Sequence, residues 1–151
     1  MKARDVMTAP VVTVDSGASL TDVFRALIDN DISGLPVVNE TGTLVGIVTE
    51  ADLVGRRAYP GSRPRFLRVV VDSRASERPR RQVGAGVTAN DVMTPFPVFA
   101  RPDDDVERLA QRMLEHGIKR IPVQDHGRLV GIVTRHDILR VFDRSDRAAT
   151  G

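Results

Sequence analysis

The sequence predicts a mixed α/β (α+β) fold built from two similar repeats. The tetrapeptide Asp-Val-Met-Thr occurs at residues 5–8 and again at residues 91–94, and Leu-Val-Gly-Ile-Val-Thr occurs at residues 44–49 and again at residues 129–134. The spacing between copies falls from 86 residues for the first motif to 85 for the second, as expected if a turn of variable length separates two strands. Apolar residues recur at helical spacing between the two motifs of each copy. Each repeat is therefore expected to run strand, helix, strand, strand, helix.

A short strand and an amphipathic helix open each repeat. The β-branched residues at 11–14 predict the first strand, and residues 98–99 occupy the same place in the second copy. Ser19 and Asp105 are the expected N-caps of the two helices. At about 1.5–3 kcal/mol per large buried side chain, each apolar stripe is worth on the order of 10 kcal/mol before entropy, so both helices should be covered. The stripes consist of Leu20, Val23, Phe24, Leu27 and Ile28 and, in the second copy, of Val106, Leu109, Ala110, Met113 and Leu114.

The second half of each repeat is expected to be a β-hairpin followed by a short helix. Residues 35–38 and 43–49 flank a polar turn in the first repeat, and residues 121–123 and 129–134 do so in the second. The first strand of each hairpin contains a proline, which removes a ladder donor and suits the start of a strand or a sheet edge. The second strand is apolar on both sides, so both of its faces should be covered.

Charge divides the chain into segments. We expect a first repeat at residues 1–57, a basic linker at 58–88, a second repeat at 89–143 and a flexible tail at 144–151. Nine arginines and only two acidic residues lie between Val54 and Ala89, so this segment carries +7 while the rest of the chain carries −5. The segment also contains an apolar run at residues 66–71, which predicts an added strand, an added helix or a contact surface.

Composition excludes several classes of protein. The chain of 151 residues is long enough for one stable core, and the two repeats are expected to share it as one module. Its apolar runs are far shorter than the roughly 20 residues that span a bilayer, and no signal peptide follows Met1, so we expect a cytoplasmic protein without membrane contact. The absence of cysteine excludes disulfides and thiolate zinc sites. No nucleophile elbow or Walker glycine loop is present, and the three histidines (His116, His126 and His136) are too scattered for a shared metal site, so an enzyme is not expected.

Taken together, these motifs resemble a tandem pair of CBS domains, the modules named after cystathionine β-synthase. The resemblance rests on the Asp-Val-Met-Thr element, on Gly-Ile-Lys-Arg-Ile-Pro-Val at residues 117–123, and on Gly-Ile-Val-Thr-x-x-Asp at residues 46–52 and 131–137. It covers residues 3–57 and 89–143 and is that of a stand-alone, bacterial-type CBS-pair protein. It implies a pseudo-twofold module with two clefts, in which many members of the family bind adenine nucleotides or related adenosyl compounds as regulatory signals.

The resemblance also implies the residues of the ligand sites. The family's Thr-x-x-Asp carboxylate accepts both ribose hydroxyls, and the threonine and nearby amides favour a phosphate. Cations around the second motif favour an anionic ligand there, whereas the first motif is surrounded by Ser33, Gly34, Glu50 and Ala51. In the family, phosphates from both clefts point toward the central axis, so two of these cations, Lys119 and Arg120, also suit a nucleotide held by Asp52. The implied ligand-binding residues are Thr134, Asp137, Lys119, Arg120, Arg135, His136, Thr49 and Asp52, with Met7, Thr8, Val11, Val12, Met93, Pro95 and Val98 near the base.

Three functions remain open on sequence grounds. The resemblance implies a regulatory module that senses AMP, ADP, ATP or S-adenosylmethionine, requires no cofactor, and signals through a homodimer or a protein effector. A second hypothesis is nucleic-acid binding by the arginine-rich linker. A third is a structural adaptor with empty clefts, because threonine followed three residues later by aspartate is also a helix-capping box. For the residues near the base, ordinary core packing is the competing interpretation.

Overall fold

The computed structural model describes residues 1–54 and 88–149. The apolar run at 66–71 and almost all of the arginine-rich linker lie outside the described residues. The chain forms two compact units. Unit 1 combines Met1–Val11 with Pro97–Gly151, and unit 2 spans Val12–Phe96.

Within the described part of unit 2, a mixed four-stranded sheet is accompanied by three helices. The sheet has the spatial order β1-β2-β3-β4, with β1 parallel to β2 and the other neighbours antiparallel. Its strands are β1 (Val14–Asp15), β2 (Gly34–Val38), β3 (Leu44–Thr49) and β4 (Thr94–Pro95), and its helices are α2 (Leu20–Asp29), α3 (Glu50–Val54) and α5 (Ala89–Val92). The hairpin β2-β3 and the helix after Ser19 confirm the predicted order, and the Ser19 hydroxyl accepts a hydrogen bond from the Asp22 amide at 3.2 Å.

Unit 1 repeats this plan, but single β-bridges replace two of the strands. Its elements are α1 (Ala3–Val6), α6 (Val106–His116), β5 (Arg120–Asp125), β6 (Arg128–Thr134) and α7 (Arg135–Ala149). Single bridges stand where unit 2 has β1 and β4: Ala100 pairs in parallel with Val123, and Thr8 pairs antiparallel with Ile132. The first strands are therefore shorter than predicted, because β1 begins only at Val14 and residues 98–99 form no strand.

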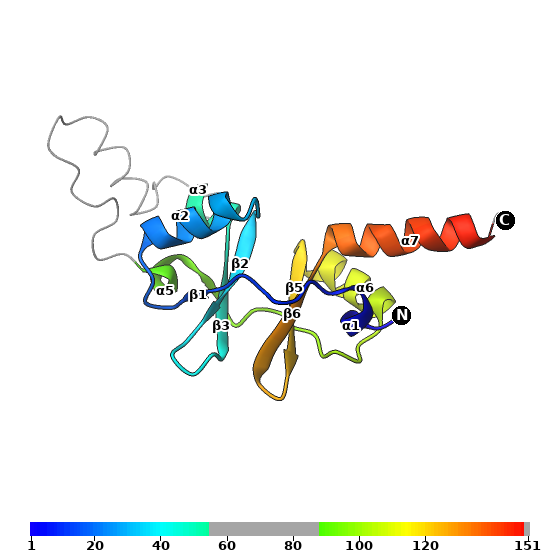
Figure 1. The fold of residues 1–151 in the computed structure, drawn as a ribbon, viewed down its shortest axis with the longest axis horizontal. Coiled ribbons are helices and arrows are strands. Elements are labelled where there is room, and N and C mark those ends of the chain that lie inside the picture. The colour runs from blue at the N-terminus through cyan, green and yellow to red at the C-terminus, as the bar shows by residue number, and fades with distance from the viewer. Residues whose placement is uncertain (55–87, 150–151) are drawn as a thin grey trace, which may run out of the picture. The chain divides into compact units, whose positions relative to one another are not determined.

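The packing units differ from the sequence repeats, because each repeat's first segment packs with the hairpin of the other repeat. We call residues 1–11 and 88–96 the leading segments. The first lies in unit 1, where the Thr8 amide donates to the Ile132 carbonyl of β6 at 2.9 Å. The second lies in unit 2, where Ile47 of β3 pairs with Thr94 of β4. Figure 1 shows α1 beside α6 and α5 beside α2. The repeat boundaries predicted at 57 and 89 describe the sequence, whereas the leading segments are exchanged in space.

Each unit has its own apolar core. Leu20, Val23 and Leu27 of α2 are buried against the sheet of unit 2, and Val106, Leu109 and Met113 of α6 are buried in unit 1. No polar or charged residue among those described is buried. Two members of the predicted stripes are not in the core: Ile28 is 76% exposed and Leu114 is 84% exposed. Each directly follows the last buried residue of its helix, Leu27 in α2 and Met113 in α6.

The last helix is longer than the sequence indicated. A flexible tail was expected from residue 144, but α7 continues to Ala149. Arginine and alanine are good helix formers, and the Arg147 guanidinium pairs with the Asp143 carboxylate one turn earlier at 3.3 Å. These local interactions extend the helix beyond Ile138, the buried residue that anchors it.

Candidate ligand-binding site

The Thr-x-x-Asp motif of unit 1 is a rigid pair at the start of α7. The Thr134 amide and hydroxyl both donate to Oδ2 of Asp137 at 2.8 Å, and the Asp137 amide donates back to the Thr134 hydroxyl at 3.3 Å. This reciprocal pattern is a capping box, which fixes the rotamer of the carboxylate. Both side chains are half-buried, so they remain open to a ligand. A carboxylate held in this way is a preorganised acceptor for hydroxyl groups.

The motif of unit 2 has the same geometry and one additional partner. The Thr49 amide and hydroxyl donate to Oδ2 of Asp52 at 2.8 and 3.1 Å, and the Asp52 amide donates back to the Thr49 hydroxyl at 3.4 Å. In addition, the hydroxyl of Thr94 donates to Oδ1 of Asp52 at 3.2 Å. Thr94 comes from the leading segment of the second repeat, 42 residues along the chain. This contact was not predicted from the sequence, where its only signal is the position of Thr94 in the repeated tetrapeptide.

A methionine from the leading segment packs on a strand glycine beside each motif. A β-carbon at Gly46 of β3 would overlap the Met93 sulfur and lie 3.0 Å from the Thr94 carbonyl oxygen. At Gly131 of β6 it would overlap the Met7 sulfur in the same way. Glycine at these positions therefore allows the leading segment to approach the strand that ends in the Thr-x-x-Asp motif.

The surroundings of the two motifs differ in charge. Lys119, Arg135 and His136 are exposed in unit 1, Arg120 is half-buried, and the Arg135 amide donates to the Lys119 carbonyl at 2.8 Å. This bond ties the start of α7 to the segment before β5. In unit 2 the Glu50 amide donates to the Ser33 carbonyl at 2.9 Å, so Glu50 takes the place of Arg135 in the same local structure. The cations predicted around the second motif thus belong to unit 1, as does that motif.

The residues expected near a base are divided between the units. Val11 and Val98 are half-buried in unit 1. Val12 is exposed in unit 2, where the exposed Pro95 pairs with Gly46 in the sheet. Pro95 is therefore on the same sheet as Thr49, the residue directly before helix α3, which carries Asp52. None of the four is part of a buried core. Met7 and Met93, also expected near a base, pack against the cores of unit 1 and unit 2.

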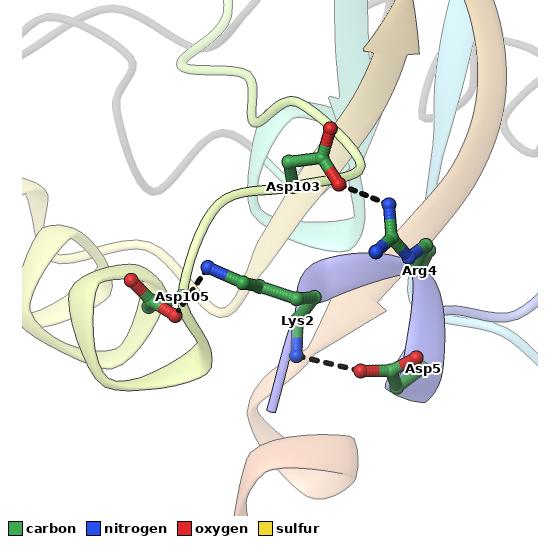
Figure 2. Close-up of polar contacts among 5 residues, drawn as sticks. All are labelled: Lys2, Arg4, Asp5, Asp103 and Asp105. Atoms are coloured by element: carbon green, nitrogen blue, oxygen red, sulfur yellow. Dashed lines mark hydrogen bonds and ion pairs between the residues drawn. The ribbon is translucent and has the colours of Figure 1, made fainter.

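Ion pairs that were not predicted from the sequence hold the leading segment of unit 1 in place. Figure 2 shows Lys2 pairing with Asp105 and Arg4 pairing with Asp103, while the Lys2 amide donates to the Asp5 carboxylate at 2.8 Å. The Lys2 ammonium lies 2.8 Å from Oδ1 of Asp105 and holds the pKa of that carboxyl below its usual value, chiefly through the hydrogen bond. The same contact raises the pKa of Lys2. Asp105 therefore serves this pair, and its side chain makes no capping bond to α6.

An open groove of about 1070 Å³ runs beside α6 in unit 1. Its lining is mostly charged and includes Arg101, Asp104 and Arg112, of which the last two form an ion pair at 3.6 Å. None of the Thr-x-x-Asp residues borders it. We take the Thr-x-x-Asp pairs as the candidate site, because they combine fixed acceptors with a repeated local structure.

In the described residues no group of three or more histidine, aspartate or glutamate side chains is arranged to hold a metal ion. His126 is 96% exposed in the turn between β5 and β6 and lies 2.7 Å from the Asp125 carboxylate. None of the helices described is long and apolar enough to cross a membrane.

Comparison with known proteins identifies the fold family. The CBS domain family matches residues 3–59 and 89–144. An uncharacterized protein of Methanocaldococcus jannaschii, MJ1426, is 33% identical over 94% of this chain and 91% of its own length. CBSX2 of Arabidopsis thaliana is 29% identical over 84% of this chain, but the match covers only 56% of its own length. An L-aspartate semialdehyde sulfurtransferase of M. jannaschii is 30% identical, and the match covers only 23% of that enzyme.

Solved structures agree with this assignment. CBSX2 in complex with AMP has a TM-score of 0.73 and 27% identity, covering 96% of this chain and 98% of the other. The CBS domain pair of protein MJ0100 in complex with 5′-methylthioadenosine and S-adenosyl-L-methionine has a TM-score of 0.70 and 29% identity, covering 96% and 98%. The family match covers both repeats, and the similarity to these pairs extends over nearly the whole chain. The chain belongs to the CBS domain family and contains a tandem CBS pair.

Proposed function

We propose that this CBS pair is a regulatory module that binds an adenine nucleotide or another adenosyl compound at its Thr-x-x-Asp pairs. It transmits binding to a protein effector or through self-association. Two similar proteins support the class of ligand: CBSX2 was solved with AMP, and the MJ0100 pair with 5′-methylthioadenosine and S-adenosyl-L-methionine. The contacts proposed for the ligand require only binding groups, and catalysis is not part of the proposal.

The observation that carries the proposal is the fixed carboxylate of Asp137. Thr134 directs both of its hydrogen bonds to Oδ2. Oδ1 is then the acceptor for the two hydroxyls of a ribose. A hydroxyl that donates to a charged acceptor typically contributes about 1.5–3 kcal/mol. The competing interpretation is a capping box that serves only the helix, with the protein acting as an adaptor.

Charge favours an anionic ligand in unit 1. Lys119, Arg120 and Arg135 belong to the segments that flank the Thr134 and Asp137 pair, with His136 at the second position of α7. Arginine and lysine both bind phosphate, and a helix N-terminus adds a favourable dipole. A phosphorylated adenosine compound such as AMP, ADP or ATP is therefore the ligand that we assign to unit 1. A cationic compound such as S-adenosylmethionine suits unit 2 better than a phosphorylated one does, because Glu50 replaces Arg135 there.

The test is thermal unfolding of the purified protein with AMP, ADP, ATP, S-adenosylmethionine and GTP. A ligand that binds only the folded state raises its stability, by about 2.7 kcal/mol at a hundredfold excess over Kd. Asp137→Ala should weaken AMP binding at least tenfold, since two hydrogen bonds to a charged acceptor are lost.

The chain contains a matched control for this variant. Thr88 and Asp91 form the same box at the start of α5 in unit 2, with hydrogen bonds of 2.8 and 3.1 Å to Oδ2 of Asp91. Asp91→Ala removes a capping box but leaves the proposed unit 1 site intact, so AMP binding there should be unchanged. Equal losses in both variants, or no thermal shift with any ligand, would favour the adaptor.

Self-association through α2 and α6 is the second part of the proposal. Ile28 and Leu114 are 86 positions apart, stand at the same point of the two repeats, and are both largely exposed. A patch that occurs twice on one chain suits a symmetric contact with a second copy. Analytical ultracentrifugation should show a dimer that Ile28→Glu with Leu114→Glu converts to a monomer. A monomeric wild-type protein, with and without AMP, would refute this part.

A further inference from the structure

We propose that Thr94 occupies part of the ribose acceptor of Asp52, so that the unit 1 site binds an adenosyl ligand more tightly than the unit 2 site. Thr94 is then a residue that sets the affinity of Asp52 from a distant part of the sequence. This inference rests on the proposed function. It concerns the order in which the two sites fill and the residue responsible.

Asp52 has a limited capacity to accept hydrogen bonds. A carboxylate offers about four lone-pair sites, two on each oxygen. In Asp52 both sites on Oδ2 are taken by the amide and the hydroxyl of Thr49. The Thr94 hydroxyl takes one of the two sites on Oδ1 at 3.2 Å. A ribose diol donates two hydrogen bonds, so it fits Asp52 only if the Thr94 hydroxyl gives way.

The same count for Asp137 gives a different result. Its Oδ2 accepts from the amide and the hydroxyl of Thr134, as in unit 2. Thr8 is the counterpart of Thr94, and within residues 1–54 and 88–149 the structure places no hydrogen bond between Thr8 and Asp137. Both sites on Oδ1 therefore suit the two hydroxyls of a ribose. The two motifs are identical in sequence pattern but not in acceptor capacity.

The Thr94 hydroxyl is a strong competitor because its backbone is held in place. Thr94 pairs with Ile47 in the sheet, and its half-buried side chain lies next to the end of β3. The Met93 amide donates to the Ala89 carbonyl at 2.9 Å, which closes helix α5 directly before β4. A group held in this way has a high effective concentration at Oδ1, whereas a ligand loses translational and rotational entropy when it binds.

Adenosine separates this effect from the difference in charge. It carries the ribose diol and no phosphate, so Lys119, Arg120 and Arg135 add no ion pair to its binding. Asp137→Ala removes the unit 1 acceptor and leaves Asp52 as the site that is observed. Thr94→Val is close to threonine in shape but lacks the hydroxyl, and Thr94→Ser keeps the hydroxyl.

The experiment is isothermal titration of adenosine into four proteins: wild type, Asp137→Ala, Asp137→Ala with Thr94→Val, and Asp137→Ala with Thr94→Ser. We expect Asp137→Ala to lose the tighter site. Adding Thr94→Val should lower the Kd of adenosine at the remaining site about tenfold, because the ligand no longer has to replace the hydrogen bond from the Thr94 hydroxyl to Asp52. Adding Thr94→Ser should leave the affinity of Asp137→Ala unchanged. Circular dichroism checks that each variant is folded.

Two results would overturn the inference while leaving the proposed function standing. If Thr94→Val leaves adenosine binding unchanged, the Thr94 bond does not compete with the ligand. If it weakens binding, Thr94 is itself a ligand contact. Failure of wild-type protein to bind adenosine, AMP or S-adenosylmethionine would instead contradict the proposed function, and the inference with it.

Discussion

Gly46→Ala tests the packing of a leading segment on the strand that carries the site. The new β-carbon would overlap the Met93 sulfur, and it would lie 2.8 Å from the Met93 γ-carbon and 3.0 Å from the Thr94 carbonyl oxygen. Met93 packs against the core of unit 2, and Thr94 is fixed in the sheet, so neither moves without cost. Overpacking of this kind typically destabilises a protein by about 1–3 kcal/mol. For a chain of this size, that corresponds to a fall in Tm of about 2–12 °C.

Urea unfolding followed by circular dichroism measures the effect. A double-mutant cycle with Met93→Ala isolates the clash, and the coupling energy should be at least about 1 kcal/mol, because removing the methionine makes room for the methyl group. Gly17→Ala is the matched control, since a β-carbon at Gly17 has no atom within 4 Å, and its stability should stay within about 0.5 kcal/mol of wild type. The reasoning fails if Gly46→Ala is as stable as Gly17→Ala, or if Met93→Ala gives no recovery.

Two further predictions concern the stability of unit 1. Leu109→Ala should lower the free energy of unfolding by about 2–5 kcal/mol, because Leu109 is fully buried in α6. Leu139 is 58% exposed, so Leu139→Ala should lower it by less than about 1 kcal/mol. Equal midpoints of urea unfolding for the two variants would contradict the core assignment. The lowered pKa of Asp105 means that its contribution to stability is present above the unfolded value of 3.8 and is lost as the pH falls through the lower folded value. Asp105→Asn should therefore lose less Tm than wild type does when the pH falls from 5 to about 2. Adding 1 M NaCl should reduce this difference between the two proteins, because salt screens the ion pair. Parallel curves of Tm against pH would show that the pair with Lys2 adds no stability.

Several features of the fold were predictable because they depend on local sequence. The repeat, the helix after Ser19 and the hairpin from Gly34 to Thr49 follow from periodicity, capping and β-branched runs, which act between residues close in the chain. The first strands were overestimated: only Val14 and Asp15 form β1, because a β-branched run indicates strand propensity but does not supply a pairing partner. The exposure of Ile28 and Leu114 was also unpredictable. Helical spacing identifies the apolar face of a helix, but not how far along the helix other elements cover that face.

The sequence by itself determined the two copies of the Thr-x-x-Asp pair and the cations that accompany the second. Thr134 and Asp137 are three residues apart, so their hydrogen bonds are a property of one helix turn. The tertiary structure alone decided that the leading segments are exchanged between the repeats. It also placed the Thr94 hydroxyl on Asp52 across 42 residues. Such a contact depends on which strands pair and on how closely a methionine approaches a glycine. A local pattern of residues encodes neither the pairing nor the approach.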